Sequence, residues 1–382
     1  MHVLRNGTVV DADGVREADV AIEDGDIVAV GDVGDGDEET DVSGQFVAPG
    51  LIDCHVHLMM DGRPDVASAI TESDFDHAYV AAENLRAAVE AGVTTVRDLG
   101  GTGTLALDAG NAVADGRLVG PRVLACGQNV TMTGGHGHWF GREADGPAEV
   151  RRAAREQLKR GADVIKCMAT GGVLTEGAQT GAPELTFEEI EAAVEAASAK
   201  GVPTAAHAHG KEGLLNAVEA GITSIEHGTF MDREAAAAMA EADTWWVPTA
   251  CAVFNIVENP DAGIPDSAMA KAEAAVDSFV TSFDHTAAEG VRVAMGTDAG
   301  TPFNYFGDIP QEMSYMVEYG MTPGEALEAA TVNAAELCGL DDVGRVTEQF
   351  RADLVVLAEN PAEDADAWVD PAHVFADGEK VV

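Results

Sequence analysis

Two histidines lie two positions apart at the end of an apolar segment, and this spacing suits metal binding. His55 and His57 follow the run Leu51-Ile52 with one apolar residue between them. If the segment is a strand, alternate side chains share one face, so both imidazoles would point the same way. Imidazole nitrogens are common ligands of Zn²⁺. An H-x-H pair alone is only moderately specific, so its interpretation depends on other residues.

Four further polar residues stand at the ends of apolar segments. They are Lys166, His207, His227 and Asp298. Each one alone could be a buried polar group with a structural partner, and Lys166 could simply pair with Asp163. The combination of H-x-H, Lys, His, His and Asp, always at the end of an apolar segment, instead indicates a metal site. Spacing alone does not decide between His207 and His209.

The elements that would position these residues alternate regularly along the chain. Eight apolar segments are predicted to be strands: residues 46–58, 93–99, 122–127, 163–169, 203–208, 223–228, 244–249 and 291–298. Alanine-rich amphipathic runs separate several of them. This order predicts an α/β fold, a (β/α)₈ barrel over residues 49–344, whose active site lies at the carboxyl ends of the strands. The alternative is an open doubly wound sheet, but no G-x-G-x-x-G or P-loop follows the first strand.

Both termini are predicted to be rich in short strands broken by Gly and Asp turns. Residues 1–48 and 345–382 are therefore expected to form one small β-sandwich domain. The segment 253–264, together with Trp245 and Trp246, is expected to add an apolar wall to the substrate-facing loops.

The overall charge restricts the possible partners. The chain has 67 acidic and 22 basic residues, a formal net charge of -45. Such a protein would repel nucleic acid and anionic membranes. No apolar run reaches the ~18 residues that span a bilayer, and the N-terminus lacks a signal-peptide pattern. A cytoplasmic location is expected. The five cysteines are scattered without a C-x-x-C pair, which argues against a disulfide framework.

With these residues in place, the chain resembles the amidohydrolase superfamily over nearly its whole length. The resemblance is carried by residues 47–53 with His55 and His57, by 92–98, by the segments around Lys166, His207, His227 and Asp298, and by 352–357. Residues 131–137 and 163–166, followed by 170–172, resemble the prolidase-like, or Xaa-Pro dipeptidase-type, branch.

The resemblance implies a role for each matching residue. His55, His57 and Asp298 would bind one divalent ion, and His207 and His227 a second, with zinc as the expected metal. Lys166 would be carboxylated and bridge the two ions, which separates this chain from imidazolonepropionase-like relatives with one metal. A hydroxide between the ions would attack the amide carbonyl, and Asp298 would transfer its proton to the leaving nitrogen.

The resemblance also implies a substrate and an assembly. His136, and His138 beside it, would contact the substrate, and His136 could polarise its carbonyl. Arg97 and Asp98 are expected to form a buried pair below the site. The substrate would be a dipeptide or an N-acyl amino acid, and the protein a homo-oligomer. Cyclic-amide (hydantoinase-like) or phosphotriester hydrolysis, and a catalytically inactive barrel scaffold, are the alternatives.

The excess of acidic residues predicts a salt-dependent stability. Repulsion between surface carboxylates is screened when the Debye length falls from about 10 Å at 0.1 M salt to about 3 Å at 1 M. We therefore expect the melting temperature to rise with KCl up to molar concentrations, as measured by thermal denaturation. A protein that is most stable in dilute buffer would contradict this adaptation to high salt.

Overall fold

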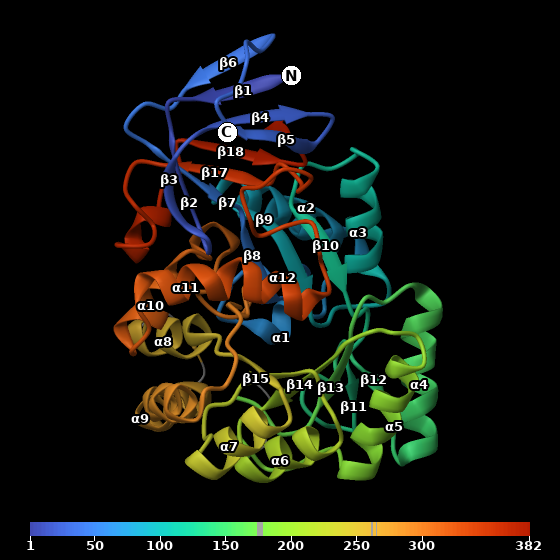
Figure 1. The fold of residues 1–382 in the computed structure, drawn as a ribbon. Coiled ribbons are helices and arrows are strands. Elements are labelled where there is room, and N and C mark those ends of the chain that lie inside the picture. Colours follow the sequence, from blue (N-terminus) through green and yellow to red (C-terminus); the bar gives the residue numbers. More distant parts are fainter. Residues whose placement is uncertain (174–178, 261–262, 265) are drawn as a thin grey trace.

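A parallel β-barrel forms the centre of the protein (Figure 1). The computed structural model describes residues 1–173, 179–260, 263–264 and 266–382. Among the described residues, the barrel wall contains seven longer parallel strands: β8 (Leu51–Val56), β9 (Val93–Asp98), β10 (Arg122–Ala125), β13 (Ile165–Met168), β14 (Thr204–Ala208), β15 (Ser224–His227) and β16 (Trp245–Val247). Two strands of two residues each, β11 (Val130–Thr131) and β12 (Arg142–Glu143), pair in parallel beside β13. Neighbouring strands pair in the orders β10-β9-β8 and β13-β14-β15-β16. Most of their residues are buried, as expected when helices cover a parallel sheet.

The eighth predicted strand, residues 291–298, is not a continuous strand in the structure. It forms two isolated parallel bridges, Trp246 with Val293 and Val56 with Ala299, and so closes the barrel between β16 and β8. The segment departs from regular strand geometry for two reasons. Asp298 has a φ of 64°, and the N–H of Thr297 donates to the side chain of Asp53 instead of to a neighbouring strand. The predicted barrel is confirmed, but its last segment is irregular at the site of the chemistry.

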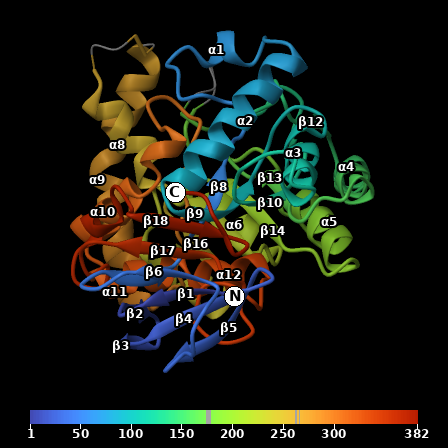
Figure 2. The same ribbon diagram turned by 90° about the horizontal axis from the view of Figure 1, so that it is seen from above.

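Helices surround the barrel, as the views along two directions show (Figures 1 and 2). They are α1 (Val66–Ala69), α2 (Asp74–Glu90), α3 (Leu105–Ala114), α4 (Pro147–Arg160), α5 (Phe187–Ser198), α6 (Lys211–Glu219), α7 (Arg233–Glu241), α8 (Ala250–Glu258), α9 (Asp266–Glu289), α10 (Gln311–Glu318), α11 (Pro323–Ala330) and α12 (Val332–Cys338). Capping boxes at Ser73, Thr186 and Thr322 set the starts of α2, α5 and α11. Within the described residues, no helix is long and apolar enough to cross a membrane.

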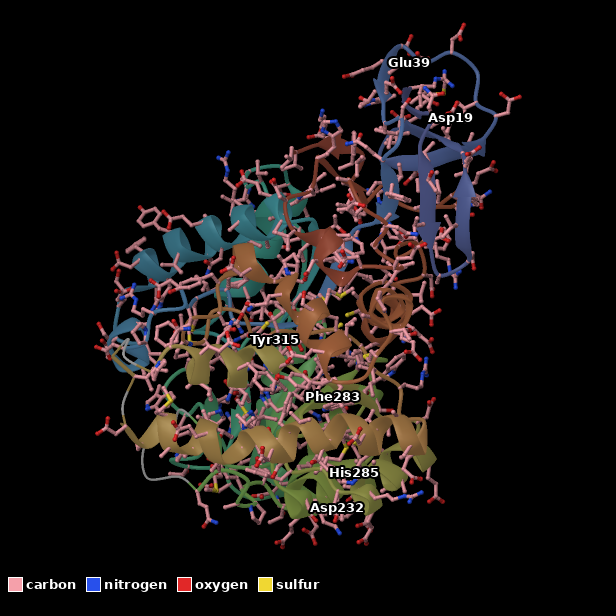
Figure 3. The ribbon with its side chains drawn as sticks, turned by 90° about the vertical axis from the view of Figure 1, so that its left-hand side faces the viewer. Asp19, Glu39, Asp232, Phe283, His285 and Tyr315 are labelled. Atoms are coloured by element: carbon pink, nitrogen blue, oxygen red, sulfur yellow. The ribbon has the colours of Figure 1, made fainter. Side chains whose placement is uncertain are left out.

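Strands from both termini form two sheets at one end of the molecule, where Figure 1 also shows the two chain ends. One sheet has the order β5-β4-β1-β6, from β1 (His2–Arg5), β4 (Asp19–Glu23), β5 (Asp26–Gly31) and β6 (Glu38–Asp41). The other has the order β19-β18-β17-β7-β2-β3, from β2 (Thr8–Asp11), β3 (Gly14–Glu17), β7 (Phe46–Pro49), β17 (Leu354–Leu357), β18 (His373–Ala376) and β19 (Glu379–Lys380). These sheets enclose an apolar core of their own, and this end, with Asp19 and Glu39, lies far from Asp232 and His285 (Figure 3).

Gly50 separates the two parts of the first predicted strand. Residues 46–58 form two strands, because β7 joins the terminal sheet while β8 joins the barrel. A Cβ on Gly50 would lie 2.2 Å from the Oγ1 of Thr94, so only glycine allows the chain to pass this closely. The close approach fixes where β8 begins and therefore the positions of His55 near its end and of His57 just after it.

Candidate active site

The structure brings the six predicted metal ligands together around one cavity. They come from the carboxyl ends of β8, β13, β14 and β15 and from the closing segment: His55, His57, Lys166, His207, His227 and Asp298. All six side chains are buried. Catalytic residues of parallel barrels lie at this end of the strands, where several loops meet. The arrangement can therefore present nitrogen and oxygen ligands to an ion while water is largely excluded.

Hydrogen bonds fix the tautomers of the two histidines of β8. His57 Nδ1 lies 2.7 Å from the carbonyl oxygen of Gly100, and His55 Nδ1 lies 3.0 Å from Glu226 Oε2. Since both partners are acceptors, each Nδ1 carries the proton and each Nε2 is left with a lone pair. Burial, helped by the charge of Lys166, lowers the pKa of His55 to about 4 and keeps its ring neutral.

The two free nitrogens face a carboxylate oxygen. Asp298 Oδ1 lies 3.4 Å from His55 Nε2 and 3.2 Å from His57 Nε2. Three lone pairs at such distances repel one another unless a positive charge lies among them. Burial opposes a positive charge on His57, but the negative charge of the adjacent Asp298 carboxylate raises the pKa of this ring. This part of the cavity therefore favours a cation.

A second group of ligand atoms adjoins the first and shares His227. The ligand atoms of His207, His209 and His227 lie within 4.8 Å of one another, as do those of His55, His227 and Asp298. His207 Nε2 and Asp298 Oδ1 are buried without a hydrogen-bond partner among the described residues. Orphaned buried acceptors of this kind are expected where a metal ion supplies the missing partner. The residues thus fit divalent metal ions.

His227 is oriented by a threonine that the sequence did not reveal as functional. His227 Nδ1 lies 2.7 Å from Thr249 Oγ1, and this hydroxyl donates its proton to the carbonyl oxygen of Pro248. Thr249 must therefore accept from His227, which leaves the Nε2 of His227 free to bind a metal. His209 Nδ1 lies 2.7 Å from Thr229 Oγ1. The geometry places both His207 and His209 beside His227, so the choice between them remains open.

Glu226 is the main functional residue that the sequence reasoning missed. Its carboxylate accepts from His55, from the Arg97 guanidinium at 3.0 Å and from Ser224 at 2.6 Å. Burial would raise the pKa of Glu226, but the charge of Arg97 and the His55 bond lower it to about 2. Alternation along a strand would place Glu226 and His227 on opposite faces. The φ of 69° at His227 breaks this alternation and brings both to the site.

The expected buried pair of Arg97 and Asp98 is wrong. Asp98 accepts instead from the backbone N–H groups of Leu58 and Gly100, while Arg97 bonds to Glu226 and to the carbonyl oxygen of Cys54. Consecutive strand residues point to opposite faces, so the side chains of Arg97 and Asp98 cannot bond to each other.

Asp53 connects β8 to the closing segment of the barrel. Its carboxylate accepts from the backbone N–H of His55 at 2.9 Å, from the N–H of Thr297 at 3.1 Å and from the Thr297 hydroxyl at 2.6 Å. Burial raises the pKa of Asp53 to about 7, although these hydrogen bonds act in the opposite direction. The bonds hold His55 and Asp298 in register, since each lies within two residues of this junction.

Lys166 is an unusual residue for such a position. Its side chain is 1% exposed, and among the residues that the structure describes no carboxylate lies within ion-pair distance of it. Burial lowers its pKa, although the charges of Glu226 and Asp298 act the other way. An ammonium group beside a bound dication would be strongly repelled. Burial at this position therefore favours the neutral amine.

The loop after the third barrel strand contributes His136 but not His138. His136 lines the cavity, and its ring centroid lies 4.2 Å from that of His207. Gly172 allows this, because a Cβ there would lie 2.3 Å from the His136 ring. His138 does not line the cavity; its Nδ1 bonds to the carbonyl oxygen of Gly135 at 2.9 Å.

Apolar side chains flank the metal-ligating residues on two sides. One wall contains Met60, Val66, Trp139, Phe140 and Met168, and the other contains Val173, Ala252, Val253 and Ile256. Of the expected segment 253–264, Val253 and Ile256 form part of the second wall, whereas positions 261 and 262 lie outside the described residues. Trp246 is a core residue that donates to the carbonyl oxygen of His227 at 2.9 Å.

The barrel and the buried ligand group together define a hydrolase of the class that uses metal ions in a barrel active site. Residues 46–381 match the model of the Amidohydrolase family. The chain belongs to this family and is a hydrolase acting on carbon–nitrogen bonds. Residues 1–52 also match the N-terminal domain of the urease alpha-subunit.

Known proteins resemble this chain over almost its full length. Ochratoxinase from Aspergillus niger is 31% identical over 98% of this chain and 85% of the relative. The crystal structure of a Xaa-Pro dipeptidase with bound methionine has a TM-score of 0.93 and 33% identity, covering 99% of each chain. A prolidase complexed with N-methylphosphonate-L-proline has a TM-score of 0.91 and 29% identity, covering 99% of this chain and 98% of that one.

The network around Glu226 gives a prediction for the whole site. Glu226→Gln removes the charge that balances Arg97 and alters the acceptor of His55, so we expect a loss of about 3–5 kcal/mol in unfolding free energy and reduced metal binding. Urea denaturation and metal analysis measure both. Ser224→Ala is the matched control, because it removes one hydrogen bond to the same carboxylate and should cost about 1 kcal/mol. Equal effects of the two variants would refute a special role for the Glu226 charge.

Proposed function

We propose that this amidohydrolase cleaves the amide bond of a dipeptide or an N-acyl amino acid. The observation that carries the proposal is the set of unprotonated histidine nitrogens that face the unpartnered Asp298 Oδ1 in the cavity. The proposal is supported by similarity to ochratoxinase and to Xaa-Pro dipeptidase and prolidase structures.

The metal ligands are assigned as follows. His55, His57 and Asp298 would hold one divalent ion, and His207 and His227 a second, with zinc as the expected metal. The Nζ of Lys166, as a neutral amine, would attack CO₂ to form a carbamate and release a proton, so that a negatively charged oxygen ligand would replace the uncharged amine. When bound, such ions make a water molecule more acidic and polarise the carbonyl oxygen of the substrate.

The chain's own residues would orient the substrate and move the proton. Asp298 Oδ1 faces the histidines, which leaves Oδ2 to take the proton of the attacking water and pass it to the leaving nitrogen. Glu226 and Gly100 hold His55 and His57 in the correct tautomer. His136 would contact the carbonyl or carboxylate of the substrate, whereas His138, which lies outside the cavity lining, would contact only a substrate that extends beyond it. The apolar walls would favour substrates with uncharged side chains and exclude water.

Further properties accompany this function. Residues 49–344 would form the catalytic domain, and residues 1–48 with 345–382 the small β domain. The protein would be a cytoplasmic homo-oligomer adapted to high salt, as its net charge of -45 suggests. It would bind neither nucleic acid nor membranes.

A substrate panel tests the scissile bond. With zinc in molar KCl, we expect turnover of apolar dipeptides and N-acyl amino acids, because the walls on both sides of the ligands are apolar. Product amino acids can be quantified by chromatography. Hydrolysis of cyclic amides or phosphotriesters alone would replace the dipeptidase assignment with one of these activities. Absence of turnover together with absence of metal would indicate a catalytically inactive scaffold.

The carbamate on Lys166 is tested by truncation. Lys166→Ala should lose metal and lower kcat by at least about 100-fold, since a bridging ligand is removed. A short carboxylic acid such as acetate or propionate should restore part of both, because it can fill the space with a carboxylate. Metal content and activity are measured with and without the acid. Lys166→Ala with full metal content and unchanged turnover would exclude the bridge.

A further inference from the structure

A buried glutamate on α10 reaches the beginning of α8, directly behind the active site. Glu312 is fully buried, and its two carboxylate oxygens accept from the backbone N–H groups of Ala250 at 2.7 Å and Cys251 at 2.8 Å. These are the first N–H groups of α8, which have no acceptor within the helix itself. A buried carboxylate is costly unless such bonds and the positive end of the helix dipole compensate it.

The need for this external acceptor comes from the residue that precedes the helix. Thr249 occupies the N-cap position, where a hydroxyl would ordinarily accept from the helix N–H groups. Its φ of 57° is left-handed, and its hydroxyl is used by His227 and Pro248 instead, so it makes no capping bond. Glu312 thus caps the helix in place of Thr249, whose hydroxyl is bonded to His227 instead.

The same helix end also borders the substrate side of the cavity. Ala252, Val253 and Ile256 of α8 line the second apolar wall, beside His207, His209 and His227. The chain from Thr249 to Ile256 is continuous, so a shift of the helix N-terminus would move both the partner of His227 and this wall. No other carboxylate among the described residues is bonded to the first N–H groups of α8.

We propose that Glu312 is a positioning residue of the active site: by holding the N-terminus of α8, it fixes Thr249 against His227 and sets the apolar wall that faces the substrate. The inference rests on the proposed function for the identity of the substrate, but its metal-binding part does not.

The test compares Glu312→Gln with a change elsewhere between the same two helices. Glutamine keeps the shape but directs an N–H group at a helix N–H. Tyr315→Phe is the matched control, because Tyr315 (labelled in Figure 3) donates from α10 to Asn255 of α8 at 3.2 Å, away from the helix end. Zinc affinity is measured by competition with a chelator, KM and kcat on an apolar dipeptide, and the melting temperature by calorimetry.

For Glu312→Gln we expect zinc affinity to fall about tenfold and KM to rise several-fold, with a smaller change in kcat. Tyr315→Phe should lower the melting temperature without either effect. Thr249→Val removes the hydroxyl that holds His227, so it should reproduce the loss of zinc affinity, and combining it with Glu312→Gln should add little to that loss. Equal behaviour of Glu312→Gln and Tyr315→Phe in zinc affinity and KM would overturn the proposal and leave Glu312 a purely structural residue.

Two further results remain interpretable. If Glu312→Gln does not fold, Glu312→Asp keeps the charge on a shorter side chain and should give a smaller loss of zinc affinity; unchanged affinity would again overturn the proposal. If the wild-type protein cleaves no amide, the proposed function fails, but the zinc titrations still decide whether Glu312 positions His227.

Discussion

The hydrogen bond between His55 and the buried carboxylate of Glu226 determines how the rest of the active site is arranged. Glu226 accepts from Arg97 on β9 and from Ser224 on its own strand, so three barrel strands meet at one carboxylate. The Arg97 charge keeps Glu226 ionised in spite of complete burial, and an ionised Glu226 can only accept, which fixes the tautomer of His55. The free nitrogen of His55 then faces Asp298. Removing any one of these charges would leave another buried without a partner.

The site also requires backbone conformations that most residues avoid. His227, Thr249 and Asp298 all have positive φ values, between 57° and 69°. Such conformations cost about 1–3 kcal/mol each and persist only where the surroundings determine them. Here hydrogen bonds stabilise all three conformations. Trp246 donates to the carbonyl oxygen of His227, and Glu312 accepts from the first N–H of the helix after Thr249. Asp53 accepts from the N–H of Thr297, the residue before Asp298. The geometry of the site therefore requires these particular supporting residues as much as it requires the candidate ligand residues themselves.

The cluster of candidate ligand residues could be predicted from the sequence better than the residues that support it. His55, His57 and Asp298 could be found because polar residues at the ends of apolar strands are conspicuous, and the barrel followed from the alternation of elements. Glu226 could not be assigned, because strand alternation places it opposite His227, and only the left-handed turn at His227 changes that. Thr249 and Glu312 are 63 positions apart in sequence and meet only through the packing of α8 against α10. Arg97 was assigned to its neighbour Asp98 because the long-range partner is invisible in one sequence.

The acidic residues of this protein are either exposed to solvent or buried, and the two groups respond differently to salt. Most of the 67 contribute to a surface whose repulsion depends on salt, whereas seven of those that the structure describes are buried: Asp11, Asp53, Asp98, Glu226, Asp298, Glu312 and Asp353. Four of these lie in or beside the active site and depend on specific partners. Glu226 is balanced by a guanidinium, Asp298 faces histidines, Asp53 binds N–H and hydroxyl groups, and Glu312 binds a helix terminus. Salt screens exposed charges far more than buried ones. A change in ionic strength should therefore alter the stability of the whole fold while leaving the geometry of the active site nearly constant, which lets one chain combine a highly charged surface with a precisely arranged group of buried histidines and carboxylates.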